Sequence, residues 1–449
     1  MTVITTIARG GVVIALVLVV ALVVRYPFMQ QKVESDASLA VAPSAATGET
    51  PGTDGHAGFI YGRITTIDGD RYEGRLRWGG DQEAFWGDYF NGAKAENPWA
   101  AYAAEPEDSS PIEIFGVRIG GRDRGTNLRR LFMARFGDIA RIEPHFRDAQ
   151  VRLKSGTVVT LDRFAAGDID DGVRVWDRKL GVVDVDARQI RTIEFLAAAP
   201  IGAGPDRLHG TVRTRQGTFT GFIQWDQQES VGSDELHGRS DGGEVNLRYE
   251  TIGSITRTSR DTALVMLLDG REMALSGTRA VGNSNRGIYV DDVRYGRVLV
   301  SWDAFERVDF SPGGSGPGYA DYSPGRALAG SVTTRAGRRL TGRLVYDFDE
   351  SETTETLDAA LPGVDYNIPF SRIASIVPNG REGRWAPYAT VILLGGEELQ
   401  LERTGDLGDR NAGVLVFADS HERPDNVPWA DVARIDFVNL SGDHQRNAQ

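Results

Sequence analysis

The chain has 449 residues, a formal net charge of −13 at pH 7 and no cysteine, and 41% of its residues are hydrophobic. This composition is that of a globular protein, and the length predicts two to four domains rather than a single core. The absence of cysteine excludes disulfides, thiol catalysis and thiolate zinc sites. Because nucleic-acid binding needs a clustered positive surface, the negative charge argues against nucleic acid as a partner.

An uncharged apolar run of fifteen residues, 10–24, lies close to the N-terminus. A bilayer-spanning helix needs about 17–25 residues. The mostly apolar residues 3–8, and the interfacial Tyr26 and Phe28, extend the run to that length. The sequence therefore predicts a membrane helix within residues 3–29, a single-pass location in the inner membrane and a periplasmic body. The alternative is a cleaved signal peptide and a secreted body, although no small-x-small cleavage site follows the run.

A unit of about 110 residues recurs three times in the rest of the chain. The three copies open on a glycine that is followed seven residues later by a second glycine: Gly62, Gly210 and Gly330. They close on an alternating run that ends in phenylalanine: Ile193-Glu-Phe195, Val308-Asp-Phe310 and Ile435-Asp-Phe437. Such a triplication determines the architecture of a chain before any single residue does.

The repeats and the segments between them divide the chain. We expect an anchor or signal segment (1–29), a flexible linker (30–58), a first repeat (59–196) with an insertion at about 79–115, a second repeat (208–310), a linker (311–326), a third repeat (327–438) and a tail (439–449). The linkers are rich in Gly, Pro, Ala and Ser, which is typical of segments without regular structure.

Apolar and polar residues alternate through each copy, which is the period of a strand. Asp68-Gly69 and Asp269-Gly270 are hairpin signals. No long stretch beyond residue 57 keeps a helical period. The predicted fold class is therefore all-β, with three tandem copies that follow the N-terminal membrane helix.

The start of each copy resembles the small SH3-like and Sm-like barrels. The resemblance covers about thirty residues and depends on a strand and turn followed by Gly-x-Leu and an aromatic-Asp pair, as in Gly342-Arg-Leu344 and Tyr346-Asp347. A finer period, Ile64, Gly69 and Gly74 in the first half of a copy and Val265, Gly270 and Leu275 in the second half, predicts two such small barrels in each copy. Sm-like proteins bind RNA, but the charge of this chain gives no support for carrying that property over.

The first copy is about thirty-four residues longer than the others between its aromatic residue and its next Ile-x-x-Ile step. Insertions in repeat proteins often form a binding face, so the candidate binding residues come from this part of the chain: Phe85, Trp86, Tyr89, Phe90, Trp99, Arg122, Arg124, Arg129 and Arg130. The spacing of the first four predicts one face of a short helix. Two interpretations follow: a helix that covers one end of a barrel, or a docking surface with aromatic anchors and arginines for an anionic group.

The usual signatures of catalysis are missing from the sequence. It contains no phosphate-binding Gly-rich loop, no Gly-x-Ser-x-Gly elbow and no His-Glu-x-x-His. We therefore predict no catalytic residue, no metal site and no cofactor. The expected function is that of an exported, membrane-tethered binding or scaffold module of the cell envelope, with an envelope protein or glycan as partner. The alternative is a glycan-processing hydrolase that uses a carboxylate pair between repeats. The oligomeric state stays open.

Overall fold

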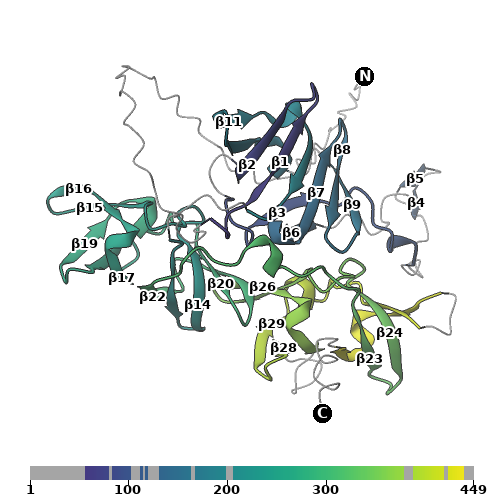
Figure 1. Ribbon diagram of the computed structural model, residues 1–449. Helices are drawn as coiled ribbons and strands as arrows, with labels where there is room; N and C mark the ends of the chain where they lie inside the picture. The colour runs from purple at the N-terminus through teal and green to yellow at the C-terminus, as the bar shows by residue number, and fades with distance from the viewer. Residues whose placement is uncertain are drawn as a thin grey trace, which may run out of the picture. The chain divides into compact units, whose positions relative to one another are not determined.

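The computed structural model describes residues 56–79, 83–102, 112–114, 117–119, 131–162, 167–198, 206–378, 388–418 and 423–438 (Figure 1). The predicted membrane segment 3–29 and the tail 439–449 lie outside these ranges. No helix within the ranges has the length and hydrophobicity that a bilayer span requires. The longest helix described, α1 (Gly167–Asp170), has four residues. The prediction of an all-β body is confirmed.

The first of three large sheets has eight strands, in the order β11-β10-β2-β1-β12-β7-β8-β9. In chain order these strands are β1 (Tyr61–Thr66), β2 (Arg71–Trp78), β7 (Ile139–Pro144), β8 (Asp148–Leu153), β9 (Val158–Asp162), β10 (Val173–Asp177), β11 (Gly181–Val185) and β12 (Ile190–Phe195).

The second sheet has twelve strands, in the order β16-β15-β19-β18-β17-β22-β13-β14-β20-β21-β26-β25. Ten of them follow one another in the chain: β13 (His209–Thr214), β14 (Gly217–Gln224), β15 (Glu235–Ser240), β16 (Gly243–Arg248), β17 (Ile252–Arg257), β18 (Thr262–Leu267), β19 (Glu272–Ser276), β20 (Ile288–Asp292), β21 (Gly296–Val300) and β22 (Phe305–Ser311). The other two, β25 (Thr356–Leu361) and β26 (Val364–Pro369), form a hairpin from further along the chain. That hairpin joins the sheet where β26 pairs antiparallel with β21.

The third sheet has eight strands, in the order β29-β28-β27-β32-β23-β24-β30-β31. They are β23 (Ala329–Thr334), β24 (Arg339–Tyr346), β27 (Ile373–Val377), β28 (Tyr388–Leu393), β29 (Glu398–Glu402), β30 (Val414–Phe417), β31 (Asp425–Val427) and β32 (Val432–Phe437).

Two smaller pairs and several single turns complete the described elements. The pairs are β3 (Tyr89–Ala93) with β6 (Leu131–Arg135), and β4 (Ile112–Ile114) with β5 (Val117–Ile119). The 3-10 turns are η1 (Ala100–Tyr102), η2 (Phe136–Asp138), η4 (Ala187–Gln189), η5 (Tyr249–Thr251), η6 (Arg279–Val281), η7 (Tyr319–Asp321), η8 (Phe370–Arg372), η9 (Gly405–Leu407) and η10 (Trp429–Asp431).

Glycines inside the strands allow neighbouring backbones to come close together. Gly62 of β1 lies opposite Gly74 of β2. A Cβ atom on Gly74 would lie 1.9 Å from the carbonyl oxygen of Trp176 on β10, so no other residue fits there. The pairs Gly210–Gly221 and Gly330–Gly342 repeat the arrangement in the other two sheets. The glycines that close hairpins, such as Gly69 with φ +93°, form a separate class.

The segment 311–326, between the second and third sheets, packs on the first. Tyr319 and Tyr322 lie against the hydrophobic core of the first sheet, and the Tyr319 hydroxyl donates to the carbonyl of Ile139 at 2.8 Å. Lys154 Nζ donates to the carbonyls of both tyrosines, at 2.6 and 2.9 Å. These contacts fix the segment in place, although its Gly- and Pro-rich composition predicts a linker.

Candidate functional site

The first four candidate aromatic residues lie in the interior. Phe85, Trp86 and Phe90 are fully buried and Tyr89 is 3% exposed. They do not form the predicted helix: a bridge between Phe59 and Phe85 and a turn lead into β3, which begins at Tyr89. The helical spacing was misleading because the segment instead folds around a carboxylate. Asp88 accepts hydrogen bonds from the N–H groups of Ala84 and Phe85, at 2.8 and 3.0 Å, and this fixes the turn.

Each aromatic ring has partners that explain its burial. Trp86 packs on Tyr319 with ring centroids 4.5 Å apart and donates from Nε1 to the carbonyl of Ala57 at 3.1 Å. Phe90 meets Trp78 edge-on at 5.5 Å. Burial raises the pKa of Tyr89 to about 12. These rings therefore stabilise the first sheet.

Trp99 lies in a different setting, on a segment that reaches from the first sheet to the third. This segment, residues 94–102, follows β3, and we call it the arm. Trp99 is half-buried and packs against Phe417 at 5.7 Å between centroids. Asn97 Nδ2 donates to the carbonyl of Phe348 at 2.8 Å.

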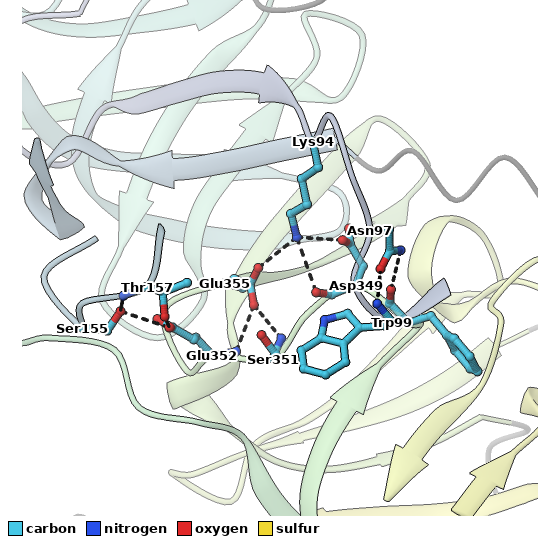
Figure 2. A network of polar contacts seen from close by, with 10 residues as sticks. Lys94, Asn97, Trp99, Ser155, Thr157, Asp349, Ser351, Glu352 and Glu355 are labelled. Carbon is cyan, nitrogen blue, oxygen red and sulfur yellow. Dashed lines mark hydrogen bonds and ion pairs between the residues drawn. The ribbon is translucent and has the colours of Figure 1, made fainter. Parts of the chain in front are cut away.

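Lys94, at the start of the arm, forms buried ion pairs with the third part of the chain (Figure 2). Its Nζ lies 2.7 Å from Asp349 and 3.2 Å from Glu355, and only 10% of its side chain is exposed. Burial alone would lower the pKa of Lys94, but the two carboxylates outweigh it and raise that pKa. Beside this pair, Ser155 and Thr157 donate to Glu352. The arm is thus held by charge and by ring contacts.

The four candidate arginines, Arg122, Arg124, Arg129 and Arg130, lie outside the described residues.

A polar cavity of about 220 Å³ lies between the first and second sheets. Its lining includes Glu83, Asp88, Tyr89, Asp168, Tyr289 and Arg297. Asp168 accepts from the backbone N–H of Asn91 at 2.7 Å, and Arg297 stacks over the ring of Tyr289 at 3.5 Å. The cavity therefore combines several carboxyl groups with one guanidinium.

The carboxyl groups of this cavity hold their protons unusually tightly. Burial, followed by the nearby Asp88 and Asp168, raises the pKa of Glu83 to about 8. Burial also raises the pKa values of Asp88 and Asp168. A protonated glutamate beside another carboxyl group can act as a general acid. Across the described ranges, no group of three or more Asp, Glu or His side chains is placed to hold a metal ion.

Sequence reasoning missed Glu83, Arg297 and Lys94, and it interpreted Asp168 as an acid of a turn between two strands. One signal for Glu83 was present: each copy places a glutamate four or five residues after its aromatic residue, and the two are bridged in the structure. The pairs are Trp78–Glu83, Trp225–Glu229 and Tyr346–Glu350. No local signal identifies Lys94, because its partners lie more than 250 residues away.

Comparison of the chain with models of protein families, with curated proteins and with solved structures found no match.

Proposed function

We propose that the body consists of three tandem copies of one β unit, preceded by a membrane helix within residues 3–29. Strand order supports the repeat. The first sheet, followed from β11 to β9, and the third sheet, followed from β31 to β29, have the same order of corresponding strands. The eight strands of the second sheet from β21 to β19 give that order again, and β15 and β16 follow beyond β19. The strand pairing is therefore consistent with the sequence repeat, position by position.

Each copy, on this proposal, contains two five-stranded SH3-like modules that are interleaved rather than sequential. One module is β11-β10-β2-β1-β12, and its chain is interrupted after β2 by the strands of the other. The second copy supports this division most directly, because β16-β15-β19-β18-β17 are consecutive neighbours there. On this alignment the hairpins β3–β6, β15–β16 and β25–β26 correspond, and the extra residues of the first copy are 94–130 rather than 79–115.

We propose that the protein is an exported, membrane-tethered, non-catalytic binding or scaffold module of the cell envelope. The observation that carries this proposal is how the units are joined. The β25–β26 hairpin of the third extends the sheet of the second, and the arm of the first places Lys94 among carboxylates of the third. Joined in this way, the units can present surfaces at fixed spacing, which is what a scaffold requires.

A second candidate function is glycan hydrolysis, favoured by the cavity that contains Glu83 and Asp168. A structural role for Glu83 competes with it. Glu229 and Glu350 have the same backbone bridge and also have raised pKa values, to about 7 in Glu229, chiefly through burial. A buried glutamate at this point therefore recurs where no catalytic cavity is needed, and we prefer the binding function.

Two measurements on intact cells and one on the purified chain test the proposal and separate the candidates. A reporter enzyme that is active only outside the cytoplasm, fused after residue 60, should be active. Glu83→Gln should leave cross-links between the full chain and envelope components unchanged, and purified full chain should release no fragments from envelope glycan. Reporter activity only in the cytoplasm would refute export. Glycan release that is lost in Glu83→Gln but kept in the matched control Glu229→Gln would favour the hydrolase.

A further inference from the structure

Among the described residues, Arg343 and Phe417 form an arginine–aromatic pair that binds an aromatic side chain from elsewhere in the molecule. Arg343 of β24 and Phe417 of β30 are direct partners in strand register. The guanidinium lies 4.2 Å from the Phe417 ring and 5.2 Å from the Trp99 ring of the arm. Tyr102 also packs on Phe417, at 5.8 Å. The pair and the arm form a docking contact that can be examined in detail.

A second pair has the same register and borders a cavity. Arg75 of β2 and Trp176 of β10 are direct partners, with the guanidinium 4.1 Å from the Trp176 ring. Phe59 lies on the guanidinium as well, at 4.9 Å. The three side chains border a cavity of about 170 Å³, whose other walls include Phe85, Ser233 and Asp234. A cavity of about 150 Å³ can accommodate a benzene ring, so this one is large enough for an aromatic side chain.

The charge at this cavity is uncompensated. Among the described residues Arg75 has ring contacts but no ion pair, and burial, followed by Arg77, lowers its pKa. Asp234 is already engaged, because its carboxylate accepts from the N–H groups of Ser230 and Val231 at 2.8 and 3.0 Å. A ligand that brings a carboxylate near Arg75 would therefore gain a charge-assisted contact.

The surface continues from the cavity to an outer strand. Val182 of β11 pairs with Trp176 and is 58% exposed, and Leu180 beside it is 65% exposed. Within the described part of the chain, β11 pairs only with β10, so its other edge is open. An extended polypeptide can follow such an edge, whereas a small anion would use only the cavity.

We propose that Arg75, Trp176 and Val182 form a docking site for a partner polypeptide that inserts an aromatic side chain, with a carboxylate a few residues away. This rests on the proposed binding function and names the chemistry of its partner. The model for the occupant is the arm itself, in which Glu96 precedes Trp99 by three residues. The arm of the same molecule is already bound to Arg343 and Phe417. The ligand of the site at Arg75 is therefore a different polypeptide.

The test uses the full chain in detergent and a fluorescein-labelled peptide with the sequence of residues 94–102. Fluorescence anisotropy should show saturable binding below about 1 mM. Arg75→Ala, and Ser233→Trp, which fills the cavity from an exposed position, should each weaken binding about tenfold or more. Arg152→Ala, an exposed arginine of β8, is the matched control and should have no effect. A peptide that carries Trp99→Ala should not bind.

The remaining outcomes overturn the proposal. Binding that is lost in Arg343→Ala but kept in Arg75→Ala would mean that the peptide only competes with the arm. Binding of inorganic phosphate at Arg75 with no binding of the peptide would make the cavity a small-anion site. Failure of either kind leaves the reporter and cross-linking tests of the proposed function unaffected, so the two proposals can fail separately.

Discussion

At the scale of single residues, the buried carboxyl groups have the clearest consequence. Glu83, Glu229 and Glu350 each follow an aromatic residue to which they are bridged, and a second acid lies five residues further on. That second acid, Asp88, Asp234 or Glu355, accepts two backbone N–H groups of the intervening turn. The second acid therefore fixes the turn that places the first acid where burial raises its pKa.

A pH dependence of stability follows for Glu83. Its pKa rises from an ordinary value of 4.5 to about 8 in the folded state, so the folded protein binds this proton more tightly than the unfolded chain. The stabilisation is complete below about pH 4.5 and is lost as the pH rises to about 8. We expect the melting temperature to fall across this window, and to fall less in Glu83→Gln. The exposed Glu235→Gln is the control, and an equal fall in all three proteins would contradict the prediction.

The sequence predicted single residues correctly where their structure depends on neighbouring residues in the chain. The alternation in 61–66 and 190–195 predicts the strands and their buried faces, because that period is a property of neighbouring residues. The spacing predicts a helix for Phe85, Trp86, Tyr89 and Phe90. A turn followed by a strand can give aromatic residues the same sequence spacing as a helix does. The two structures differ in that Asp88 accepts hydrogen bonds from the backbone N–H groups of Ala84 and Phe85. The spacing of the aromatic residues does not reveal this contact.

At the scale of elements, the pairing of β21 with β26 could not be predicted. Both strands alternate apolar and polar residues as expected. That pattern does not indicate which other strand pairs with an edge strand, because the pairing also depends on the register and on the distance between the two strands. Gly296 lies where β21 and β26 come close together. A Cβ there would lie 2.6 Å from the Asn367 carbonyl oxygen and 2.6 Å from Cδ of Pro369. Gly181, at the same point of the β10–β11 hairpin, has nothing within 4 Å of its Cβ position.

The two glycines form a matched pair for an experiment. Both have positive φ, +86° and +77°, so alanine at either costs about 1–2 kcal/mol in backbone strain. Only Gly296→Ala must also displace β26, which should add about 1–3 kcal/mol of overpacking. Urea unfolding should therefore show the larger loss of stability for Gly296→Ala. Equal losses would mean that β26 does not press against β21 at this position.

At the scale of the whole molecule, residues far apart in the chain hold the units together. Lys94 belongs to the first repeat by sequence, yet its ion pairs are with Asp349 and Glu355. The sequence around Lys94 does not indicate these partners, because they lie more than 250 residues further along the chain. The arm is anchored at both ends, by Lys94 at its start and by Trp99 on Phe417 near its end.

A double-mutant cycle measures that contact. Lys94→Met leaves buried carboxylates without their cation, and loss of one partner of such a pair costs about 3–5 kcal/mol. Asp349→Asn also destabilises the chain. The double variant should lose clearly less than the sum of the two, because the pair is removed as a unit. Urea unfolding followed by tryptophan fluorescence gives the three values, and Lys179→Met, at an exposed lysine, is the control. Additive losses, or no loss in Lys94→Met, would show that the Lys94 ion pair does not hold the arm to the third unit.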